Sequence, residues 1–331
     1  SPRRPHWLRS AGFALSGNRR QDAKDKHGPL FRGVLASWHL YTCIMTRCGI
    51  VALAGRPNVG KSTLLNALVG EPLAITSSKP QTTRVPVRGL LTDDEAQIVF
   101  VDPAGLMEPG YALQRGMRSA ALEALRDADV VVHLHPLADA PAPPLEALAG
   151  PLRAHCLLAY TKADVVPADQ RVPLAPGAHV ISAETGEGVA ELLAAVRAAL
   201  PEGPFLYDAA DVGTQPLRFF AAEFVREAVF TALEQELPYS VAVEIEEFRE
   251  AADPVYIRAT LAVERDSQKA IVLGKGGRTI RTIGTAARER IAAFLGRRVY
   301  LDLWVTVWPH WRRDPATLAR LGLAVPTEPE R

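Results

Sequence analysis

The stretch GRPNVGKS at residues 55–62 constrains the fold of this chain more than any other feature. It follows the short apolar run CGIVALAG and precedes STLLNALVG, so the spacing G-x-x-x-x-G-K-S lies between a predicted strand and a predicted helix. Glycines let successive backbone N–H groups curl around a phosphate, and a helix that begins there adds a favourable dipole. The stretch therefore predicts a phosphate-binding loop (P-loop) in an α/β domain.

The side chains of this loop have the chemistry that a nucleoside triphosphate requires. We predict that Lys61 reaches the β- and γ-phosphate oxygens and is the catalytic residue, and that the Ser62 hydroxyl binds Mg²⁺. The predicted nucleotide-binding residues of the loop are Gly55, Arg56, Pro57, Asn58, Val59, Gly60, Lys61, Ser62 and Thr63.

Two short motifs further along the chain indicate which base is bound. TKAD (161–164) follows the apolar run CLLAY, and SAE (182–184) follows AHVI. The Asp164 carboxylate can accept hydrogen bonds from the N1–H and the exocyclic amine of guanine, whereas adenine would leave it unpaired. Each motif alone is a weak signal, but together they favour GTP. The predicted base-binding residues are Thr161, Lys162, Asp164, Ser182, Ala183 and Glu184.

Two segments between the P-loop and TKAD have the composition of a magnesium and γ-phosphate site. Asp102 ends the apolar run VFVD and begins DPAGL, where a carboxylate would hold Mg²⁺ through water and the Gly105 N–H would meet the γ-phosphate. Upstream, the loop QTTR places Thr83 at a suitable distance to cap the same ion. The predicted metal-binding residues are therefore Ser62, Thr83 and Asp102.

The pattern of apolar runs divides the chain into two domains. Residues 47–200 alternate strand-like and helix-like segments, which is typical of a parallel sheet with crossover helices, and PVRGLL with AQIVFVD predicts an antiparallel hairpin at one edge. Residues 201–216 are rich in Pro, Gly and Asp and are predicted to be a linker. Residues 217–325 follow the order α-β-β-α-α-β, which predicts a second, α+β domain with a C-terminal tail.

Residues 1–46 show no sustained period and are basic. Two interpretations compete: a disordered or artefactual extension, with Met45 as the functional start, and an organellar transit peptide, which the two aspartates disfavour. The longest uncharged run there has 14 residues, whereas a membrane span needs about 20, so no transmembrane segment is predicted. The three cysteines, Cys43, Cys48 and Cys156, fit a reducing compartment and match no zinc or disulfide pattern.

A second glycine loop, GKGG at residues 274–277, joins two predicted helices. It has no preceding strand and lacks the P-loop spacing, so it is not predicted to bind a nucleotide. Its glycines allow close approach to a nucleic-acid backbone, and an adjacent apolar groove is expected from Ile271, Val272, Ile280 and Ile283. The predicted RNA-binding residues are Lys269, Gly274, Lys275, Gly276, Gly277, Arg278 and Arg281.

Charge and aromatic residues around this loop bear on the same prediction. Residues 258–313 contain 12 Lys and Arg but four acids, although the whole chain has a formal net charge of only +1. Trp304 lies in the apolar run LDLWV and is predicted to be a core residue. Trp308 and Trp311, which precede two arginines, are the better candidates for stacking on bases.

These motifs together resemble a known family. GRPNVGKSTLLN paired with SSKPQTTR resembles the Era/TrmE branch of translation-factor-related GTPases, and the element order around GKGG resembles a type II KH domain. With ELPYSVAVEIEEF, QKAIVLGKGGRTIRTIG and LWVTVWPHWRRD, residues 47 to about 325 resemble the Era family of bacterial ribosome-assembly GTPases. The implied fold is a P-loop GTPase domain, a mostly parallel sheet with helices on both faces, followed by an α+β type II KH domain.

The resemblance implies a function. The chain would bind GTP and GDP with Mg²⁺, hydrolyse GTP slowly, grip the 3′ end of 16S ribosomal RNA through its KH domain, and act in assembly of the 30S subunit. In related GTPases an asparagine matching Asn58 ligates K⁺; simple loop geometry is the competing interpretation. The implied location is the bacterial cytoplasm, with peripheral membrane association and an organelle as lesser alternatives.

The chain departs from the family pattern at two motifs. It has DPAGL where the family usually has D-T-P-G-L, and TKAD where the family has N-K-x-D. We expect Thr161 to hold the guanine face less firmly, with guanine preference retained through Asp164. Leu106 stands where Ras-like proteins have a water-orienting glutamine. One alternative is an RNA-binding scaffold that does not turn over GTP; a tRNA-modifying GTPase is disfavoured because its helical domain and C-terminal cysteine are not predicted.

Overall fold

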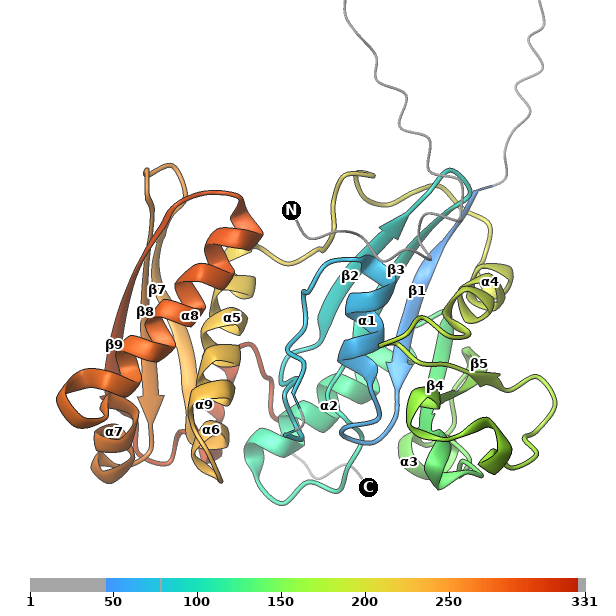
Figure 1. Ribbon diagram of the computed structural model, residues 1–331, viewed down its shortest axis with the longest axis horizontal. Helices are drawn as coiled ribbons and strands as arrows, with labels where there is room; N and C mark the ends of the chain where they lie inside the picture. Colours follow the sequence, from blue (N-terminus) through green and yellow to red (C-terminus); the bar gives the residue numbers. More distant parts are fainter. Residues whose placement is uncertain (1–45, 78, 327–331) are drawn as a thin grey trace, which may run out of the picture.

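The computed structural model describes residues 46–77 and 79–326. The predictions for the basic extension, including a start at Met45, concern residues outside those ranges. Figure 1 shows two bodies side by side: an α/β body around α1 and a smaller body around α5 and α8, each with its own sheet. The two sheets agree with the predicted fold class, a mostly parallel α/β sheet followed by a smaller α+β unit. No helix within the described ranges is both long enough and apolar enough to cross a bilayer.

The first sheet has the strand order β2-β3-β1-β4-β5-β6. Its strands are β1 (Arg47–Ala54), β2 (Val87–Thr92), β3 (Ala96–Asp102), β4 (Val130–Pro136), β5 (His155–Thr161) and β6 (His179–Val180). Only β2 runs antiparallel to its neighbour, β3, whereas the other pairs are parallel. The carboxyl ends of β1, β3 and β5 therefore meet at one edge, where ligands bind in folds of this kind.

Helices cover both faces of this sheet, as predicted. They are α1 (Lys61–Val69), α2 (Ala112–Arg126), α3 (Glu146–Ala149) and α4 (Val189–Ala199), with short 3-10 helices η2 (Leu137–Asp139), η3 (Ala163–Val165) and η4 (Ala168–Gln170). Successive side chains of β1 point to opposite faces. Val51 and Leu53 pack in one core with α1 and α4, and Ala52 and Ala54 pack in another with α2.

Two strands are less buried than the apolar runs suggest. β6 has only two residues, both half-buried, although AHVISA predicts a full buried strand. His155 and Cys156 at the start of β5 are exposed, because β6 pairs only with the later residues Ala159 and Tyr160. An apolar run alone does not say how far the neighbouring strand extends.

The predicted linker, residues 201–216, is attached to the first domain along much of its length. Gln97 accepts hydrogen bonds from the Leu206 and Tyr207 amides, and the Leu90 amide donates to Val212 O at 3.0 Å. Near its end, Gln215 Oε1 accepts a bond from the Arg88 amide at 3.0 Å. These bonds fix the point at which the second domain begins.

The second domain has the predicted order α-β-β-α-α-β, with two short α-helices and two 3-10 helices added. Its elements are α5 (Leu217–Ala232), α6 (Leu237–Ser240), β7 (Ala242–Arg249), β8 (Val255–Val263), α7 (Asp266–Leu273), η5 (Lys275–Gly277), α8 (Arg278–Leu295), β9 (Val299–Val307), η6 (Trp311–Arg313) and α9 (Pro315–Arg320). β7 and β8 are antiparallel, and β8 and β9 are parallel. α5 and α8 cover one face of this sheet (Figure 1).

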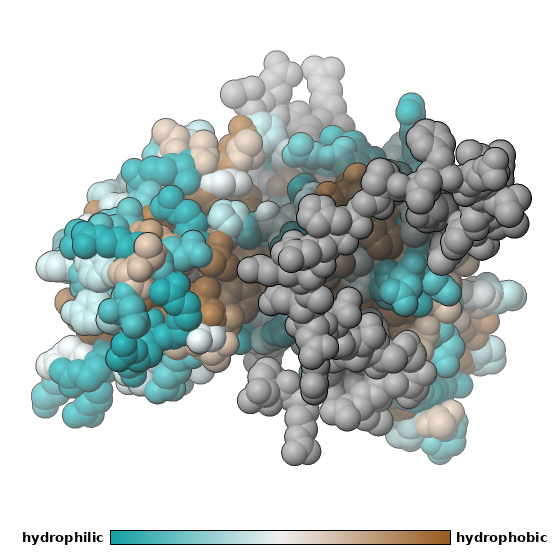
Figure 2. Space-filling view, turned by 90° about the horizontal axis from the view of Figure 1, so that it is seen from above, coloured by the Kyte–Doolittle hydropathy of each residue, from teal (hydrophilic) through white to brown (hydrophobic). Residues whose placement is uncertain are grey.

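The two domains share buried contacts. The largest buried apolar cluster contains residues of α1 and β2 together with residues of α5, α8 and all three strands of the second sheet. Seen from above (Figure 2), the second domain presents mainly hydrophilic residues, and hydrophobic residues gather next to the first domain. The loop between α1 and β2 lies at this junction, and its contacts are described below.

Candidate functional site

The P-loop is held open by backbone geometry that glycine allows. Gly60 has φ +96° and precedes α1, whose first turn closes with the Leu64 amide donating to Gly60 O at 2.9 Å. A side chain at Gly55 would lie 2.5 Å from Leu134 O. The loop lines a cleft of about 250 Å³ together with the switch loop, Gly105 and Lys162. Most of the predicted P-loop residues, part of the switch loop and one predicted base-binding residue, Lys162, therefore border one cavity.

Lys61 is buried at the base of this cleft. Its side chain is 6% exposed and its Nζ donates to Arg56 O at 3.1 Å. Burial lowers the pKa of Lys61, and the nearby Asp102 carboxylate opposes that shift. A buried ammonium group at this place favours a ligand that brings negative charge, such as a triphosphate.

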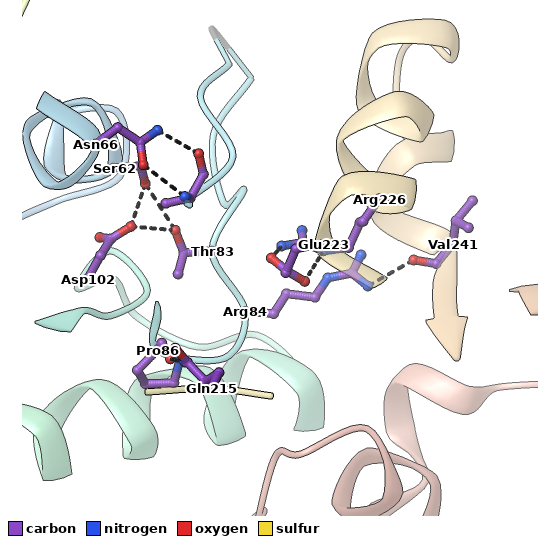
Figure 3. Close-up of polar contacts among 11 residues, drawn as sticks. Ser62, Asn66, Thr83, Arg84, Pro86, Asp102, Gln215, Glu223, Arg226 and Val241 are labelled. Atoms are coloured by element: carbon purple, nitrogen blue, oxygen red, sulfur yellow. Dashed lines mark hydrogen bonds and ion pairs between the residues drawn. The ribbon is translucent and has the colours of Figure 1, made fainter. Parts of the chain in front are cut away.

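The side chains of Ser62, Thr83 and Asp102, each carrying oxygen, converge in one place (Figure 3). Ser62 Oγ donates to Asp102 Oδ2 at 2.6 Å, Thr83 Oγ1 donates to the same oxygen at 3.1 Å, and the two hydroxyl oxygens lie 3.2 Å apart. Asp102 Oδ1 is buried and has no hydrogen-bond partner in the described part of the chain. Burial raises the pKa of Asp102, against Lys61 and the two hydroxyls, so an added cation would stabilise the carboxylate.

This cluster fits Mg²⁺. The ion prefers oxygen ligands and keeps several of its waters, so one carboxylate and two hydroxyls suit it. The prediction had named the same three residues, and the structure brings them together from α1, the switch loop and β3. An unpartnered buried carboxylate oxygen is the observation that favours a cation here.

The loop between α1 and β2, residues 71–86, is the switch segment predicted from QTTR. Five residues of this loop that were not predicted to bind nucleotide also line the cleft: Ile75, Thr76, Ser77, Gln81 and Thr82. Their place in the sequence, between the helix that follows the P-loop and Thr83, is the signal that could have identified them. Asn58, in the P-loop, adopts φ +63°, as the loop-geometry interpretation of this residue requires.

The DPAGL segment is packed against the P-loop. The Leu106 amide donates to Gly55 O at 2.9 Å, and a side chain at Gly105 would lie 2.5 Å from the backbone nitrogen of Pro57. Pro103 is buried between these contacts and Asp102. The segment that would sense the γ-phosphate therefore has little room to shift without moving the P-loop.

Of the predicted base-binding residues, Lys162 lines the cleft, and the others lie near it in the chain or in space. Thr161 Oγ1 donates to Val59 O at 2.7 Å and ties the end of β5 to the P-loop. Ser182 Oγ donates to Asp164 Oδ1 at 2.5 Å and orients that carboxylate. Ala183 is half-buried, whereas Lys162, Asp164 and Glu184 are exposed. Thr161 stands where the family has the asparagine of N-K-x-D. Its hydroxyl nevertheless connects the base-binding segment to the P-loop.

The second glycine loop lies at the exposed end of the second domain. Gly274, Gly276 and Gly277 have φ of +72°, +61° and +74°, and the Gly277 amide donates to Gly274 O at 3.1 Å. Lys275, Arg278 and Arg281 are exposed, and Lys269 is half-buried. The loop is therefore a tight turn that points backbone and positive charge outward.

The apolar groove predicted beside this loop is partly wrong. Val272 and Ile283 are fully buried in the domain core, because α7 and α8 turn these positions toward the sheet. Ile271 is exposed and Ile280 is partly buried, so these two remain available. A hollow of about 410 Å³ lies instead along the outer side of α8, where it is lined by Arg278, Arg281, Thr282, Thr285, Ala286 and Glu289.

The tryptophan predictions are reversed by the structure. Trp304 is 60% exposed, because Leu301, Leu303 and Val305 face the helices and the even-numbered residues of β9 face the other way. Trp311 is 1% exposed and donates from Nε1 to Ser240 O at 3.0 Å. Trp308 is half-buried under Arg320. Trp311 is therefore a core residue and no base platform.

Part of the positive charge counted near the loop is used inside the protein. Ion pairs join Arg258 to Asp302, Arg290 to Glu227, Arg298 to Asp253 and Arg312 to Glu264. The charge that projects beside GKGG comes from Lys275, Arg278 and Arg281. The count from sequence therefore overstated the charge available to a nucleic acid.

Fold and site together define a P-loop GTPase domain followed by a KH domain. Residues 50–162 match the family described as 50S ribosome-binding GTPase, and residues 236–312 match the KH domain family. The chain is 43% identical to the GTPase Era of Afipia carboxidovorans over 300 residues, covering 86% of this chain and 96% of that relative. The chain belongs to the Era family of GTPases. The predicted family, fold class and GTPase activity are confirmed.

Other members give the same result. The GTPase Era of Thermotoga maritima is 42% identical over 292 residues, covering 84% of this chain and 97% of that relative. A crystal structure of an Aquifex aeolicus Era variant bound to GDP and AlF4⁻ superposes with a TM-score of 0.80 at 35% identity, covering 85% of this chain and 100% of that one. Era in complex with MgGDPNP and nucleotides 1506–1542 of 16S ribosomal RNA gives 0.78 at 34% identity, with the same coverage.

Proposed function

We propose that this GTPase is a guanine-nucleotide switch that hydrolyses GTP slowly, binds the 3′ end of 16S ribosomal RNA through its KH domain, and acts in assembly of the 30S subunit. One observation carries the proposal: a cleft lined by P-loop and switch residues, beside the cluster of Ser62, Thr83 and Asp102, occurs in one chain with an outward-facing GKGG loop. A relative of similar structure is bound to MgGDPNP and 16S ribosomal RNA nucleotides together.

The nucleotide end works through positioning and charge. Ser62, Thr83 and Asp102 would hold Mg²⁺, which neutralises charge on the β- and γ-phosphates when bound. Lys61 is already buried and aimed into the cleft, so it can stabilise negative charge that develops on the transferred phosphoryl group. Asp164, oriented by Ser182, would read guanine.

Slow turnover is expected from the residue that follows Gly105. Leu106 is buried among α2 and its neighbours, so its side chain neither reaches the cleft nor orients a water molecule. Hydrolysis then depends on Mg²⁺, on Lys61 and, in this hypothesis, on K⁺ held at Asn58. We assign the active form to the bacterial cytoplasm; peripheral membrane contact remains a secondary hypothesis.

The RNA end combines backbone access with charge. At GKGG the chain can approach a sugar–phosphate backbone closely, since no atom lies within 4 Å of where a side chain at Gly276 would stand. Lys275, Arg278 and Arg281 project beside it, and the hollow along α8 offers space for nucleotides. We place the GTPase domain at residues 47–200, the linker at 201–216 and the KH domain at 217–325.

The test is binding of fluorescent GDP, GTP and ATP analogues to the full chain, followed by steady-state phosphate release in K⁺ and in Na⁺ buffers. We expect guanine-specific binding, slow release of phosphate, and faster release in K⁺ than in Na⁺. Equal rates in both salts would remove K⁺ from the proposal. RNA binding without guanine-dependent turnover would favour the scaffold alternative, which the TKAD and DPAGL departures motivate.

A further inference from the structure

The switch loop, residues 71–86, is fixed to the GTPase domain at both ends. Near its start, Asn66 exchanges two hydrogen bonds with the backbone of Ala74, at 2.8 and 2.9 Å. Near its end, Thr83 joins Ser62 and Asp102 in the magnesium cluster. Lys79, between these points, and Arg84, directly after Thr83, contact the second domain. Figure 3 shows Arg84 reaching from the loop that carries Thr83 toward Glu223, Arg226 and Val241.

Two cationic side chains of this loop bind the KH domain. Lys79 Nζ donates to Phe230 O at 2.5 Å and to Leu233 O at 2.6 Å, which are carbonyls at the C-terminal end of α5. Arg84 donates to Val241 O at 2.8 Å and to Tyr239 O at 3.0 Å, at the end of α6. Carbonyls at a helix end have no partner within the helix, so a cation there satisfies them.

Arg84 is buried at the domain junction. Its guanidinium lies 5.4 Å from the centre of the Trp311 ring, beside the buried ion pair of Glu223 and Arg226. Burial, followed by the charge of Arg226, lowers the pKa of Arg84 to about 9. A charge kept in such surroundings must be bound well, because leaving it or its carbonyl partners unpaired is costly. Arg84 directly follows Thr83, so the residue that binds the KH domain is next in the chain to the predicted Mg²⁺ ligand.

The helix that begins at the RNA loop touches the same switch loop. α8 begins at Arg278, directly after GKGG, and three turns later Arg290 Nη2 donates to Pro72 O at 2.6 Å. Arg290 is held in place by Glu227 of α5 at 3.2 Å. A shift of α8 or α5 on RNA binding would therefore act on the loop that carries Thr83.

We propose that Lys79 and Arg84 are positioning residues, which fix Thr83 relative to the KH domain and thereby couple RNA binding to nucleotide binding through loop 71–86. The inference rests on the proposed function, since it supplies the contacts by which such a switch would operate. Coupling between two binding sites is reciprocal, so RNA must change nucleotide affinity by the same factor as nucleotide changes RNA affinity.

The experiment measures the affinity of a fluorescent, non-hydrolysable GTP analogue with Mg²⁺, with and without a short RNA copying the 3′ end of 16S ribosomal RNA. The ratio of the two affinities is the coupling factor. We expect a factor of at least about fivefold for the unaltered chain, and less than about twofold for Lys79→Met and Arg84→Gln. Arg84→Lys should retain part of it, because one ammonium group can still bind a carbonyl.

The matched control is Arg88→Gln, which removes an exposed arginine of β2 four residues from Arg84 and should leave the factor unchanged. GDP binding without RNA is measured in every variant to establish that each one still folds and binds nucleotide, and the coupling factor is compared only among those that do. Should Arg84→Gln fail to fold, Lys79→Met decides the question. A full factor retained in Lys79→Met overturns the inference while leaving the switch intact. A coupling factor of one in the unaltered chain would contradict both the proposed switch and this inference.

Discussion

Thr161 shows how a single substitution in a motif can keep its structural role. The family pattern has asparagine at this position, and its replacement by threonine predicts a weaker hold on guanine. Its hydroxyl nevertheless donates to Val59 O at 2.7 Å, so the base-binding loop and the P-loop stay joined. A small side chain succeeds here because the end of β5 passes close to the P-loop, a distance that no local sequence pattern reports.

We predict that Thr161→Val weakens GDP binding about two- to tenfold. Valine keeps the shape of threonine but loses the hydroxyl, and a buried hydrogen bond of this kind contributes roughly 0.5–1.5 kcal/mol. Titration with fluorescent GDP measures the change, and Thr161→Ser, which keeps the hydroxyl, is the control. If valine and serine bind GDP equally, the hydrogen bond to Val59 has no part in holding the nucleotide.

Mutation can distinguish the buried Trp311 from the exposed Trp304, whose predicted roles were the reverse. Trp311→Ala removes a buried ring and its bond to Ser240, and should lower the free energy of unfolding by about 3–5 kcal/mol. Trp304→Ala removes an exposed ring and should change it by about 0.5 kcal/mol or less. Urea unfolding followed by circular dichroism compares them. Similar losses in both would contradict the burial described here.

At the scale of elements, α8 offers a matched pair of glycines. Gly276 precedes the helix and Gly296 follows it, with φ of +61° and +63°, and neither would place a side chain within 4 Å of another atom. The backbone cost of an aspartate should therefore be similar at both positions. Only Gly276 lies in the loop proposed to meet phosphate.

Gly276→Asp should accordingly weaken RNA binding at least about tenfold, because the added carboxylate repels the phosphate backbone. Gly296→Asp should stay within about twofold, with a similar loss of thermal stability. Fluorescence anisotropy of labelled RNA gives both affinities. Equal weakening at the two sites would mean that the loop makes no specific contact with RNA.

The type and order of most elements could be predicted because their signals are local. The P-loop, the hairpin of β2 and β3, and the α-β-β-α-α-β order all follow from apolar period and glycine position. The short β6 and the inward turn of Val272 and Ile283 could not, since they depend on what lies beside each element. For Trp304 the strand period was itself sufficient, because it places this residue opposite Leu303.

The whole molecule is held together by contacts that no local pattern contains. Lys79, Arg84 and Arg290 bind backbone carbonyls that lie between 151 and 218 residues away along the chain. Every residue has a backbone carbonyl. The sequence therefore shows where the cationic side chains are but not which carbonyls they bind. The convergence of Ser62, Thr83 and Asp102 was predictable because each occurs in an ordered motif. The contacts at the junction of the domains were not predictable in this way.

In the proposed switch, GTP and RNA each favour the same arrangement of the two domains, so each strengthens binding of the other. The direct measurement is the affinity of the full chain for the 3′-end RNA in two states, loaded with GDP and with a non-hydrolysable GTP analogue, each with Mg²⁺. We predict tighter RNA binding with the GTP analogue, by at least about fivefold. Equal affinities in the two states would contradict the claim, even if both ligands bind well.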